Sequence, residues 1–386
     1  MRILHSSDWH LGRSFHRVGM LEHQAAFVDH MVDAVRSEGI DVVVVAGDVY
    51  DRALPAVDAV TVLDDALSRL LDAGAQVLLT SGNHDSAGRL GFASRVLAHG
   101  GVHLRTRVDE LARPVLLADR HGPVALYGLP YLEPAMCAGP LGASQRSHQG
   151  VLAAAMHRVR ADLTTRAPGT RSLVAAHAFV VGGQVSGSER DISVGGVGAV
   201  PASVFDGVDY VALGHLHGRQ RLGETMRYSG SPLAYSFSEA DHTKGSWVLE
   251  LGAGGVTSVQ PLHAPVPRPL RVLRGRLDDL LTQPVHADAE RAWCQVVLTD
   301  AVRPRAAMAR LQQRFPHTLS LSFEPQGAPA AAQTYAARVR GRSDVDVCCG
   351  FVDHVRGAGP DDDERALLAR ALELARTTTL SDGDAA

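Results

Sequence analysis

The sequence has few cysteines and no long apolar run. Four cysteines in 386 residues are too few for a disulfide framework, and none has the CxxC spacing of a structural zinc site. The longest apolar runs, such as residues 42–46, fall far short of the roughly 20 residues that a membrane helix needs. No apolar signal-peptide core follows Met1. We therefore expect a protein of the reducing cytoplasm.

Lysine is nearly absent, since Lys244 is the only lysine among 38 basic residues. A phosphate-binding loop of the GxxxxGKS/T type needs a lysine after glycine, whereas Lys244 follows Thr243, so ATP binding by such a loop is excluded. With 42 acidic residues the net charge is −4. Proteins that bind nucleic acid through bulk charge are usually basic, so any such binding here must be local.

The first two-thirds of the chain alternates strand and helix patterns. Residues 42–45 are four consecutive valines, which is typical of a strand buried on both faces. The predicted strands cover residues 2–5, 41–46, 76–80, 124–127, 172–176, 208–213, 227–229 and 247–251. The predicted helices cover residues 21–35 and 56–71 and a segment that begins near residue 86. This alternation predicts an α/β layered domain over residues 1–262.

A proline-rich linker at residues 263–269 separates this domain from the rest of the chain. The pattern then predicts a small α+β domain over residues 270–325, with strands at 270–273, 292–298 and 318–323 and helices at 277–281 and 303–315. Residues 344–386 predict two short amphipathic helices, which are too short to bury both apolar stripes alone. They either pack on the chain's own domains or dock on a partner.

Five short motifs combine aspartate, asparagine and histidine, and each lies at or just after the carboxyl end of a predicted strand. They are Asp8-Trp-His10, Gly47-Asp-Val-Tyr-Asp51, Gly82-Asn-His-Asp85, Ala176-His177 and Gly214-His-Leu-His217. Loops at this edge of an α/β sheet converge, and ligands bind there. Oxygen and nitrogen ligands without a thiolate favour manganese, iron or zinc over calcium or magnesium.

The spacing within the motifs suits metal binding. Alternate residues of an extended segment point the same way, so a D-x-H or H-x-H pair places two ligands together. Asp48 follows a buried strand and a glycine, a position suited to a carboxylate that bridges two cations, and Asn83 supplies a neutral oxygen. Two metal ions about 3.5–4 Å apart can clamp the attacking and leaving oxygens of a phosphoryl displacement. Singly each residue could be a turn or cap residue, and His177 has the least informative neighbours, but jointly they predict a two-metal site.

These motifs resemble the calcineurin-like metallophosphoesterase superfamily, which implies a four-layer α/β sandwich. GNHD stands where the protein Ser/Thr phosphatases generally carry GNHE, and Asp51-Arg-Ala53 replaces their DRG ending. The segments MRILHSSDWHLG (residues 1–12), VAGDVYD (45–51) and YSGSPL (228–233) are similar to the SbcD family of bacterial nuclease subunits. The resemblance is strong to about residue 260 and weaker beyond. It implies a phosphoesterase domain, a small capping domain and a C-terminal helix pair that docks on an ATPase.

The resemblance also assigns residues. It implies that one metal ion is held by Asp8, His10, Asp48 and His217, and the other by Asp48, Asn83, His177 and His215. His84 is implied to contact the scissile phosphate instead, and either to stabilise the transition state or to protonate the leaving oxygen. Manganese is the implied metal.

The implied activity is hydrolysis of DNA phosphodiesters in repair, recombination and replication, as an exonuclease on duplex ends and an endonuclease on single strands and hairpins. The implied partner is a coiled-coil ATPase of the SbcC type, with two copies of each chain. Two alternatives are a phosphodiesterase on a small substrate, such as a cyclic nucleotide, and a non-catalytic scaffold. The extra domain and helix pair count against the first, and the complete motifs count against the second.

Arginines near the motif loops are candidates for DNA contacts, because a guanidinium can fork onto backbone phosphates. These candidates are Arg13, Arg17, Arg52 and Arg89. Taken singly, each has the alternative explanation of a solvated helix end.

Overall fold

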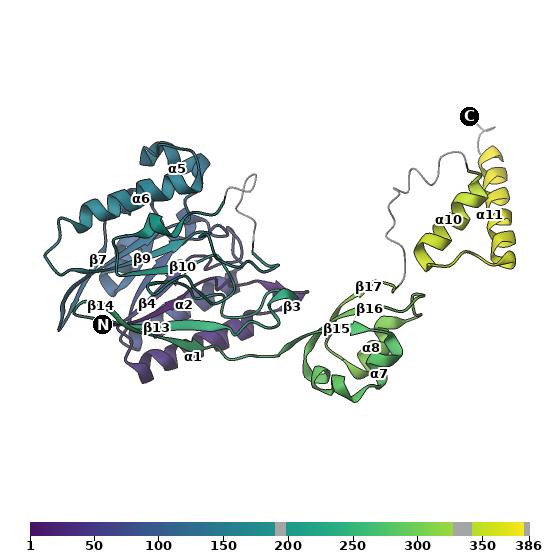
Figure 1. Cartoon of the computed structure of the whole chain (residues 1–386), viewed down its shortest axis with the longest axis horizontal. Helices are drawn as coiled ribbons and strands as arrows, with labels where there is room; N and C mark the ends of the chain where they lie inside the picture. Colours follow the sequence, from purple (N-terminus) through teal and green to yellow (C-terminus); the bar gives the residue numbers. More distant parts are fainter. Residues whose placement is uncertain (190–197, 327–341, 382–386) are drawn as a thin grey trace. The chain divides into compact units, whose positions relative to one another are not determined.

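The computed structural model describes residues 1–189, 198–326 and 342–381. It consists of two compact units, Met1–Pro267 and Arg268–Ala386. The first unit carries all five motifs and is drawn in purple to green in Figure 1.

The first unit contains two six-stranded sheets. One sheet has the order β14-β13-β1-β4-β5-β6, with β1 (Arg2–Ser6), β4 (Val42–Ala46), β5 (Gln76–Thr80), β6 (Val102–Arg105), β13 (Gly245–Gly252) and β14 (Gly255–His263). Its strands β1, β4, β5 and β6 are parallel, so their carboxyl ends lie at one edge.

The second sheet has the order β11-β12-β10-β9-β8-β7, with β7 (Val115–Asp119), β8 (Gly122–Leu129), β9 (Arg171–His177), β10 (Tyr210–Gly214), β11 (Gln220–Arg221) and β12 (Met226–Tyr228). Its four central strands β8, β9, β10 and β12 are also parallel. Antiparallel strands lie at one edge of the first sheet (β13 and β14) and at both edges of the second (β11 and β7).

Helices cover the outer faces of the two sheets. The core against the first sheet includes residues of α1 (Leu21–Glu38) and α2 (Val57–Asp72), and the core against the second includes residues of α5 (Pro134–Leu141) and α6 (His148–Leu163). Figure 1 shows α5 and α6 on one side of the strands and α1 on the other. Shorter elements complete the unit: β2 (Ser14–Phe15), β3 (Val18–Gly19), α3 (Ala87–Leu90), α4 (Ser94–Leu97), η1 (Ala98–Gly100), η2 (Val108–Glu110), η3 (Ala202–Phe205) and η4 (Phe237–Glu239).

The strand β4 shows how the sequence builds these layers. Val42 and Val44 point into the core between the two sheets, whereas Val43 and Val45 point into the core under α1 and α2. Both faces of the strand are therefore buried, as the valine run predicts. The resulting helix–sheet–sheet–helix arrangement confirms the four-layer α/β sandwich.

The second unit begins with a three-stranded parallel sheet, β15 (Leu270–Gly275), β16 (Trp293–Leu298) and β17 (Thr318–Phe323). Its core also contains residues of α7 (Leu277–Thr282), η5 (Pro284–Arg291) and α8 (Ala307–Arg314). The sequence predicts a start at residue 303 for α8, which is wrong. Pro304 disfavours helical backbone at Arg303, and Ala306, at the N-cap, has a φ of 49°.

The C-terminal helices are α10 (Asp344–Arg356) and α11 (Asp362–Ser381), as the sequence predicts. Glu364 near the start of α11 forms an ion pair with Arg356 at the end of α10, at 2.7 Å. Val355 is 50% exposed and Leu367 is 65% exposed, so part of the apolar stripes faces outward. Among the residues that the structure describes, no helix is both long and apolar enough to cross a membrane.

Candidate metal centre

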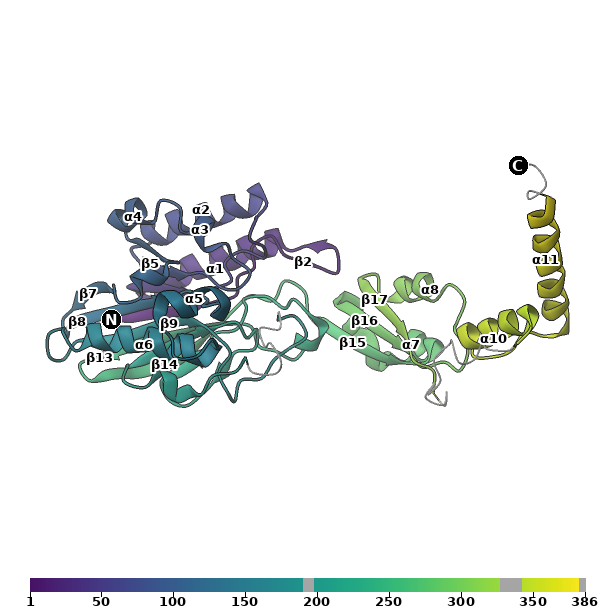
Figure 2. The same cartoon turned by 90° about the horizontal axis from the view of Figure 1, so that it is seen from above.

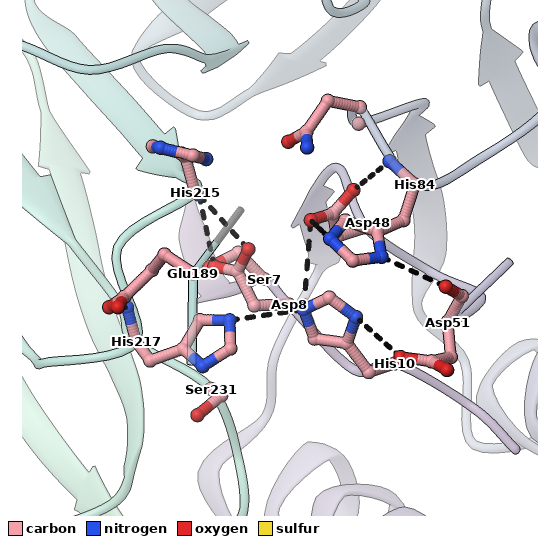
Figure 3. A network of polar contacts seen from close by, with 12 residues as sticks. Ser7, Asp8, His10, Asp48, Asp51, His84, Glu189, His215, His217 and Ser231 are labelled. Carbon is pink, nitrogen blue, oxygen red and sulfur yellow. Dashed lines mark hydrogen bonds and ion pairs between the residues drawn. The ribbon is translucent and has the colours of Figure 1, made fainter. Parts of the chain in front are cut away.

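The two sheets bring the five motifs together at one edge. Asp8, Asp48 and Asn83 lie in the loops after β1, β4 and β5 of the first sheet, whereas His177 ends β9 and His217 follows β10 of the second. Asp8, His10, Asp48, His177, His215 and His217 are all buried. The strand-end positions predicted from the sequence are therefore confirmed, and Figure 3 shows several of these side chains around a common centre.

Asp48 lies in the middle of the cluster. Its Oδ2 atom lies 3.4 Å from Nε2 of His177, 3.6 Å from Nε2 of His10 and 4.0 Å from Nε2 of His84. The second carboxylate oxygen accepts a hydrogen bond from the backbone N–H of His84, at 2.9 Å. Asp48 therefore lies next to candidate ligand residues on both sides of the centre, which is the position expected of a carboxylate that bridges two cations.

On one side of Asp48, three potential ligands converge. One carboxylate oxygen of Asp8 and one ring nitrogen each of His10 and His217 lie within 4.8 Å of one another. The Nε2 atoms of the two histidines are 3.0 Å apart, and Figure 3 shows the His10 ring between His217 and Asp48. Two ring nitrogens at this distance suit neighbouring positions on one cation with bonds of about 2.1 Å.

On the other side lie His177 and Asn83. Nδ1 of His177 donates to the backbone carbonyl of Ala46 at 3.0 Å, which turns Nε2 toward Oδ1 of Asn83, 2.9 Å away. Asp8, Asp48 and His177 also form a group within 4.8 Å. His215 is peripheral: its ring centroid lies 5.3 Å from that of His177, and its backbone N–H donates to Asp8 at 3.0 Å. The expected ligand residues thus meet, with the ring of His215 outside the tight groups found among the described residues.

The backbone of the ligand loops is unusual. Of the eight non-glycine residues with positive φ in the described parts of the chain, four are candidate ligands: Asp8 (54°), His10 (46°), Asp48 (48°) and His215 (105°). Left-handed backbone is disfavoured for such residues and is concentrated at functional sites. The strain supports a role for these loops beyond stability.

Two motif glycines allow the loops to approach closely. A Cβ atom on Gly82 would lie 2.1 Å from Oδ1 of Asp48, and one on Gly47 would lie 2.4 Å from Nδ1 of His177. Neither distance is possible for real atoms. The glycines are therefore required by the packing of the ligand loops against one another.

Replacing Gly82 by alanine is expected to displace the Asp48 carboxylate and to lower the free energy of unfolding by about 1–3 kcal/mol. Gly88→Ala is the matched control, because a Cβ there meets nothing within 4 Å. Urea unfolding and manganese titration of both variants check this. Wild-type stability and metal binding in Gly82→Ala would contradict the packing.

The electrostatics of the cluster favour positive charge at its centre. Burial alone would raise the pKa of Asp48, but His177 and the other histidines outweigh it and hold that pKa well below its usual range. For His177, Asp48 likewise outweighs burial and raises the pKa to about 9. Burial raises the pKa of Asp8 to about 6 and lowers that of His215 to about 3. The cluster thus stabilises a proton on His177 between two carboxylates, and this donor set fits divalent cations, which would compete with that proton.

Three supporting residues were not predicted from the sequence. Gln24 on α1 is buried, and its side chain binds the backbone of Gly12 (3.0 Å) and His10 (2.8 Å). Tyr235 donates to the carbonyl of Trp9 at 2.6 Å. Asp85, quoted only as part of its motif, accepts hydrogen bonds from the backbone N–H groups of Val49, Tyr50 and Gly82 at 2.9–3.0 Å and so joins two ligand loops. The one signal in the sequence is the polar Gln24 on an apolar helix face.

The candidate DNA-contacting arginines have different surroundings. Arg13 donates to the carbonyl of Ser188 at 3.0 Å and lies over the ring of Tyr235, so its guanidinium is engaged within the chain. The side chain of Arg52 is 75% exposed. Arg17 and Arg89 are also exposed, and Arg89 donates to the carbonyl of Ala53 at 3.0 Å.

Comparison with known families decides which chemistry this centre serves. The family model described as calcineurin-like phosphoesterase matches residues 1–219, which is more than half of the chain. The chain belongs to the calcineurin-like phosphoesterase family. Together with the buried histidine and aspartate groups, this membership supports a metal-dependent phosphoester hydrolase with a dinuclear site.

A second family model, SbcD_C, matches residues 266–355 and is described as the type 5 capsule protein repressor C-terminal domain. Among solved structures, the protein TT1561 of Thermus thermophilus is 12% identical with a TM-score of 0.40, over 68% of this chain and 98% of that chain. A dimetal phosphatase from Danio rerio is 14% identical with a TM-score of 0.38, over 69% and 99%. These two likenesses are weak.

Proposed function

We propose that the chain is a manganese-dependent DNA nuclease of the cytoplasm, the catalytic subunit of an SbcC–SbcD-type complex in DNA repair, recombination and replication. The observation that carries this proposal is the order of the two matched families: a phosphoesterase over residues 1–219 is followed by an SbcD_C match over residues 266–355. A phosphoesterase for a small substrate has no evident need for such a second domain. In this proposal residues 1–262 form the nuclease domain and residues 270–325 the capping domain.

We propose the two ligand sets that the family resemblance implies. One cation would be held by Asp8, His10, Asp48 and His217, and the other by Asp48, Asn83, His177 and His215. When bound, two such ions supply Lewis-acid stabilisation of the charge that develops on the phosphoryl oxygens. The chain's own contribution is to hold these side chains in fixed positions at a buried edge of the two sheets.

His84 is proposed as the catalytic residue that is not a ligand. Its Nδ1 faces the backbone carbonyl of Asp51 at 2.8 Å. A carbonyl oxygen can only accept, so Nδ1 carries a proton and donates it in this bond. Exchange of a proton with a substrate must therefore take place at Nε2, which lies on the Asp48 side, 4.0 Å from its carboxylate. From there His84 can contact the scissile phosphate or protonate the leaving oxygen.

For the DNA backbone, the exposed guanidinium groups of Arg17, Arg52 and Arg89 are the better candidates. Arg13 would have to exchange its contacts with Ser188 and Tyr235 to reach a phosphate. We therefore propose that Arg13 positions the loop after β1 and that the other three provide phosphate contacts.

The C-terminal helix pair is proposed to dock on the ATPase partner. Val355 on α10 and Leu367 on α11 are at least half exposed. Changing both to aspartate is expected to weaken binding of an SbcC-type ATPase at least tenfold, because buried apolar anchors dominate interface energies. Val285→Asp, at a 74% exposed site in η5, is the matched control. Unchanged binding in the double variant, measured by pull-down or calorimetry, would contradict the docking role.

An apolar surface near α2 supports a homodimer within a heterotetramer. Residues of α2, α3 and α4 line one groove, and these helices lie near one another in Figure 2. Around it Leu54, Val57, Phe92 and Val96 are 69–80% exposed, which is typical of an interaction surface. A monomer in sedimentation equilibrium at micromolar concentration would count against the dimer.

The deciding experiment is cleavage of labelled single-stranded and hairpin DNA by the purified chain with manganese, beside the chelated protein and a chromogenic phosphodiester. Manganese-dependent cleavage of DNA is expected. Turnover of the chromogenic ester with intact DNA, also when the ATPase subunit is added, would favour the small-substrate phosphodiesterase. Inactivity on both would favour the non-catalytic scaffold.

A further inference from the structure

Three buried or half-buried polar side chains form a hydrogen-bonded series that starts at the ring of His217. Nδ1 of His217 is 2.6 Å from Oγ of Ser188. Ser188 in turn contacts Glu239, and Glu239 contacts Lys244, each through a hydrogen bond. Glu239 is 1% exposed and Lys244 is 6% exposed. None of these three residues belongs to the sequence motifs of the metal centre.

The proton positions in this hydrogen-bonded series follow from which groups can donate and which can only accept. Lys244 is donor-only and forms a buried ion pair with Glu239, so Glu239 is present as a carboxylate. An ionised Glu239 can only accept, so Ser188 donates its single proton to it. The oxygen of Ser188 must then accept from Nδ1 of His217. This leaves a lone pair on Nε2, the atom that faces His10 at 3.0 Å.

Lys244 is also fixed by geometry. Its ammonium group makes three contacts: the backbone carbonyl of His217 at 2.8 Å, Oγ of Ser231 at 2.9 Å, and Glu239. Three acceptors around one nitrogen match an ammonium group, whereas a planar guanidinium is larger and directs its donors differently. The one lysine in an otherwise arginine-based set of cations lies at this point.

His217 is therefore held at three separate atoms. Its backbone N–H donates to Glu189 at 2.8 Å, its carbonyl accepts from Lys244, and its ring nitrogen Nδ1 is bound by Ser188. A buried ion pair by itself says little about function. Here, however, the ion pair holds a candidate ligand at two places. Lys244 binds the backbone carbonyl of His217, and Glu239 is linked to the His217 ring through the hydroxyl group of Ser188.

We propose that Ser188, Glu239 and Lys244 are positioning residues that fix the tautomer and orientation of His217, and thereby set the affinity of the ion that His217 binds. The inference rests on the proposed role of His217 as a ligand. Partners that bind the far nitrogen of a ligand histidine typically change metal affinity about 10–100-fold when they are removed.

Two substitutions test the direction of the hydrogen bonds between Glu239, Ser188 and His217. Ser188→Ala removes the acceptor of the Nδ1 proton. The Glu239 carboxylate lies 3.6 Å from Nδ1, beyond hydrogen-bond distance, so the tautomer of His217 is then no longer fixed. Glu239→Gln reverses the direction of these hydrogen bonds. The amide oxygen must face the donor Lys244, so the amide N–H faces Ser188, and Ser188 then donates to Nδ1 of His217. The ring proton moves to Nε2, where a metal ion would bind.

The measurement is a titration of the full chain with Mn²⁺ by calorimetry, supported by the ligand-field spectrum of the Co²⁺ form. We expect wild type to bind two ions, Ser188→Ala to weaken one of them about 10–100-fold with an altered Co²⁺ spectrum, and Glu239→Gln to weaken it more. Ser188→Thr, which keeps the hydroxyl group, should restore the wild-type Mn²⁺ affinity and the wild-type Co²⁺ spectrum. Ser238→Ala is the matched control, since Ser238 holds the adjacent Gly187 at 2.7 Å but does not contact His217.

The outcomes separate the two proposals. If wild type binds no ion in the cluster, the metal centre itself fails, and this inference fails with it. If wild type binds two ions and folded Ser188→Ala binds both with wild-type affinity and spectrum, only the positioning role is overturned. An equal loss in Ser238→Ala would also overturn it, because loop order alone would then explain the effect.

Discussion

Replacing Asp48 by alanine is expected to remove both metal ions and to reduce cleavage about a thousandfold or more. Asp48 Oδ2 lies within 4.0 Å of ring nitrogens of His10, His84 and His177, which places it at the centre of the cluster. Without it the two ions lose their shared anionic ligand, and the remaining donors are mainly neutral. Lewis-acid stabilisation is worth several kcal/mol, and about 1.4 kcal/mol corresponds to a factor of ten in rate.

Elemental analysis after gel filtration, together with single-strand cleavage, checks this prediction. Asp48→Asn keeps the shape of the side chain and loses its charge, so it separates the loss of a ligand from the loss of packing. Asp58→Ala, at an exposed position in the first turn of α2, is the matched control and should behave as wild type. Two retained ions in Asp48→Ala would disprove the ligand assignment.

Replacing His84 by alanine is expected to leave both ions in place and to reduce cleavage about 10²–10⁴-fold, as is typical when a general acid is removed. The imidazole packs edge-on against His10, with the ring centroids 4.7 Å apart, and its Nδ1 is engaged by Asp51. His84 is also close enough to His10 and Asp48 to complete a group of three potential ligands. If His84 is a proton donor, the variant keeps both ions, whereas if His84 is a metal ligand, the variant loses one.

Metal content and cleavage must therefore be measured on the same preparation. His99→Ala, at an exposed position in η1, is the matched control and should retain both properties. If His84→Ala loses one ion together with activity, His84 is a ligand and its assignment as the proton donor is wrong. If the variant keeps both ions and full activity, His84 has no catalytic role.

The fold is predictable where hydrophobic periodicity is strong. The strand β5 has the predicted bounds, and β4 begins one residue later than predicted, at Val42. Both lie in the middle of a sheet and are buried on both faces. The strand β14 was not predicted, since it lies at a sheet edge and has only one buried residue. The helix α6 was also missed, because its alanine-rich sequence has little contrast between faces.

The candidate ligands are predictable because two constraints act on them at once. A ligand must have the right donor atom, and it must follow a strand that ends at the shared edge, so its motif stands out in the sequence. The residues that hold them lack the second constraint. Glu239 and Gln24 reach the centre from η4 and α1, and only the tertiary structure brings them there. Lys244 differs, because its rarity marks it without indicating its role.

The most direct measurement is anomalous diffraction at the manganese edge from crystals of the full chain grown with Mn²⁺. The proposed centre predicts two peaks, one on each side of the Asp48 carboxylate. The first should lie beside His10 and His217, and the second beside Asn83 and His177. A single peak, or peaks away from Asp48, would contradict the two-metal centre on which the proposed nuclease depends.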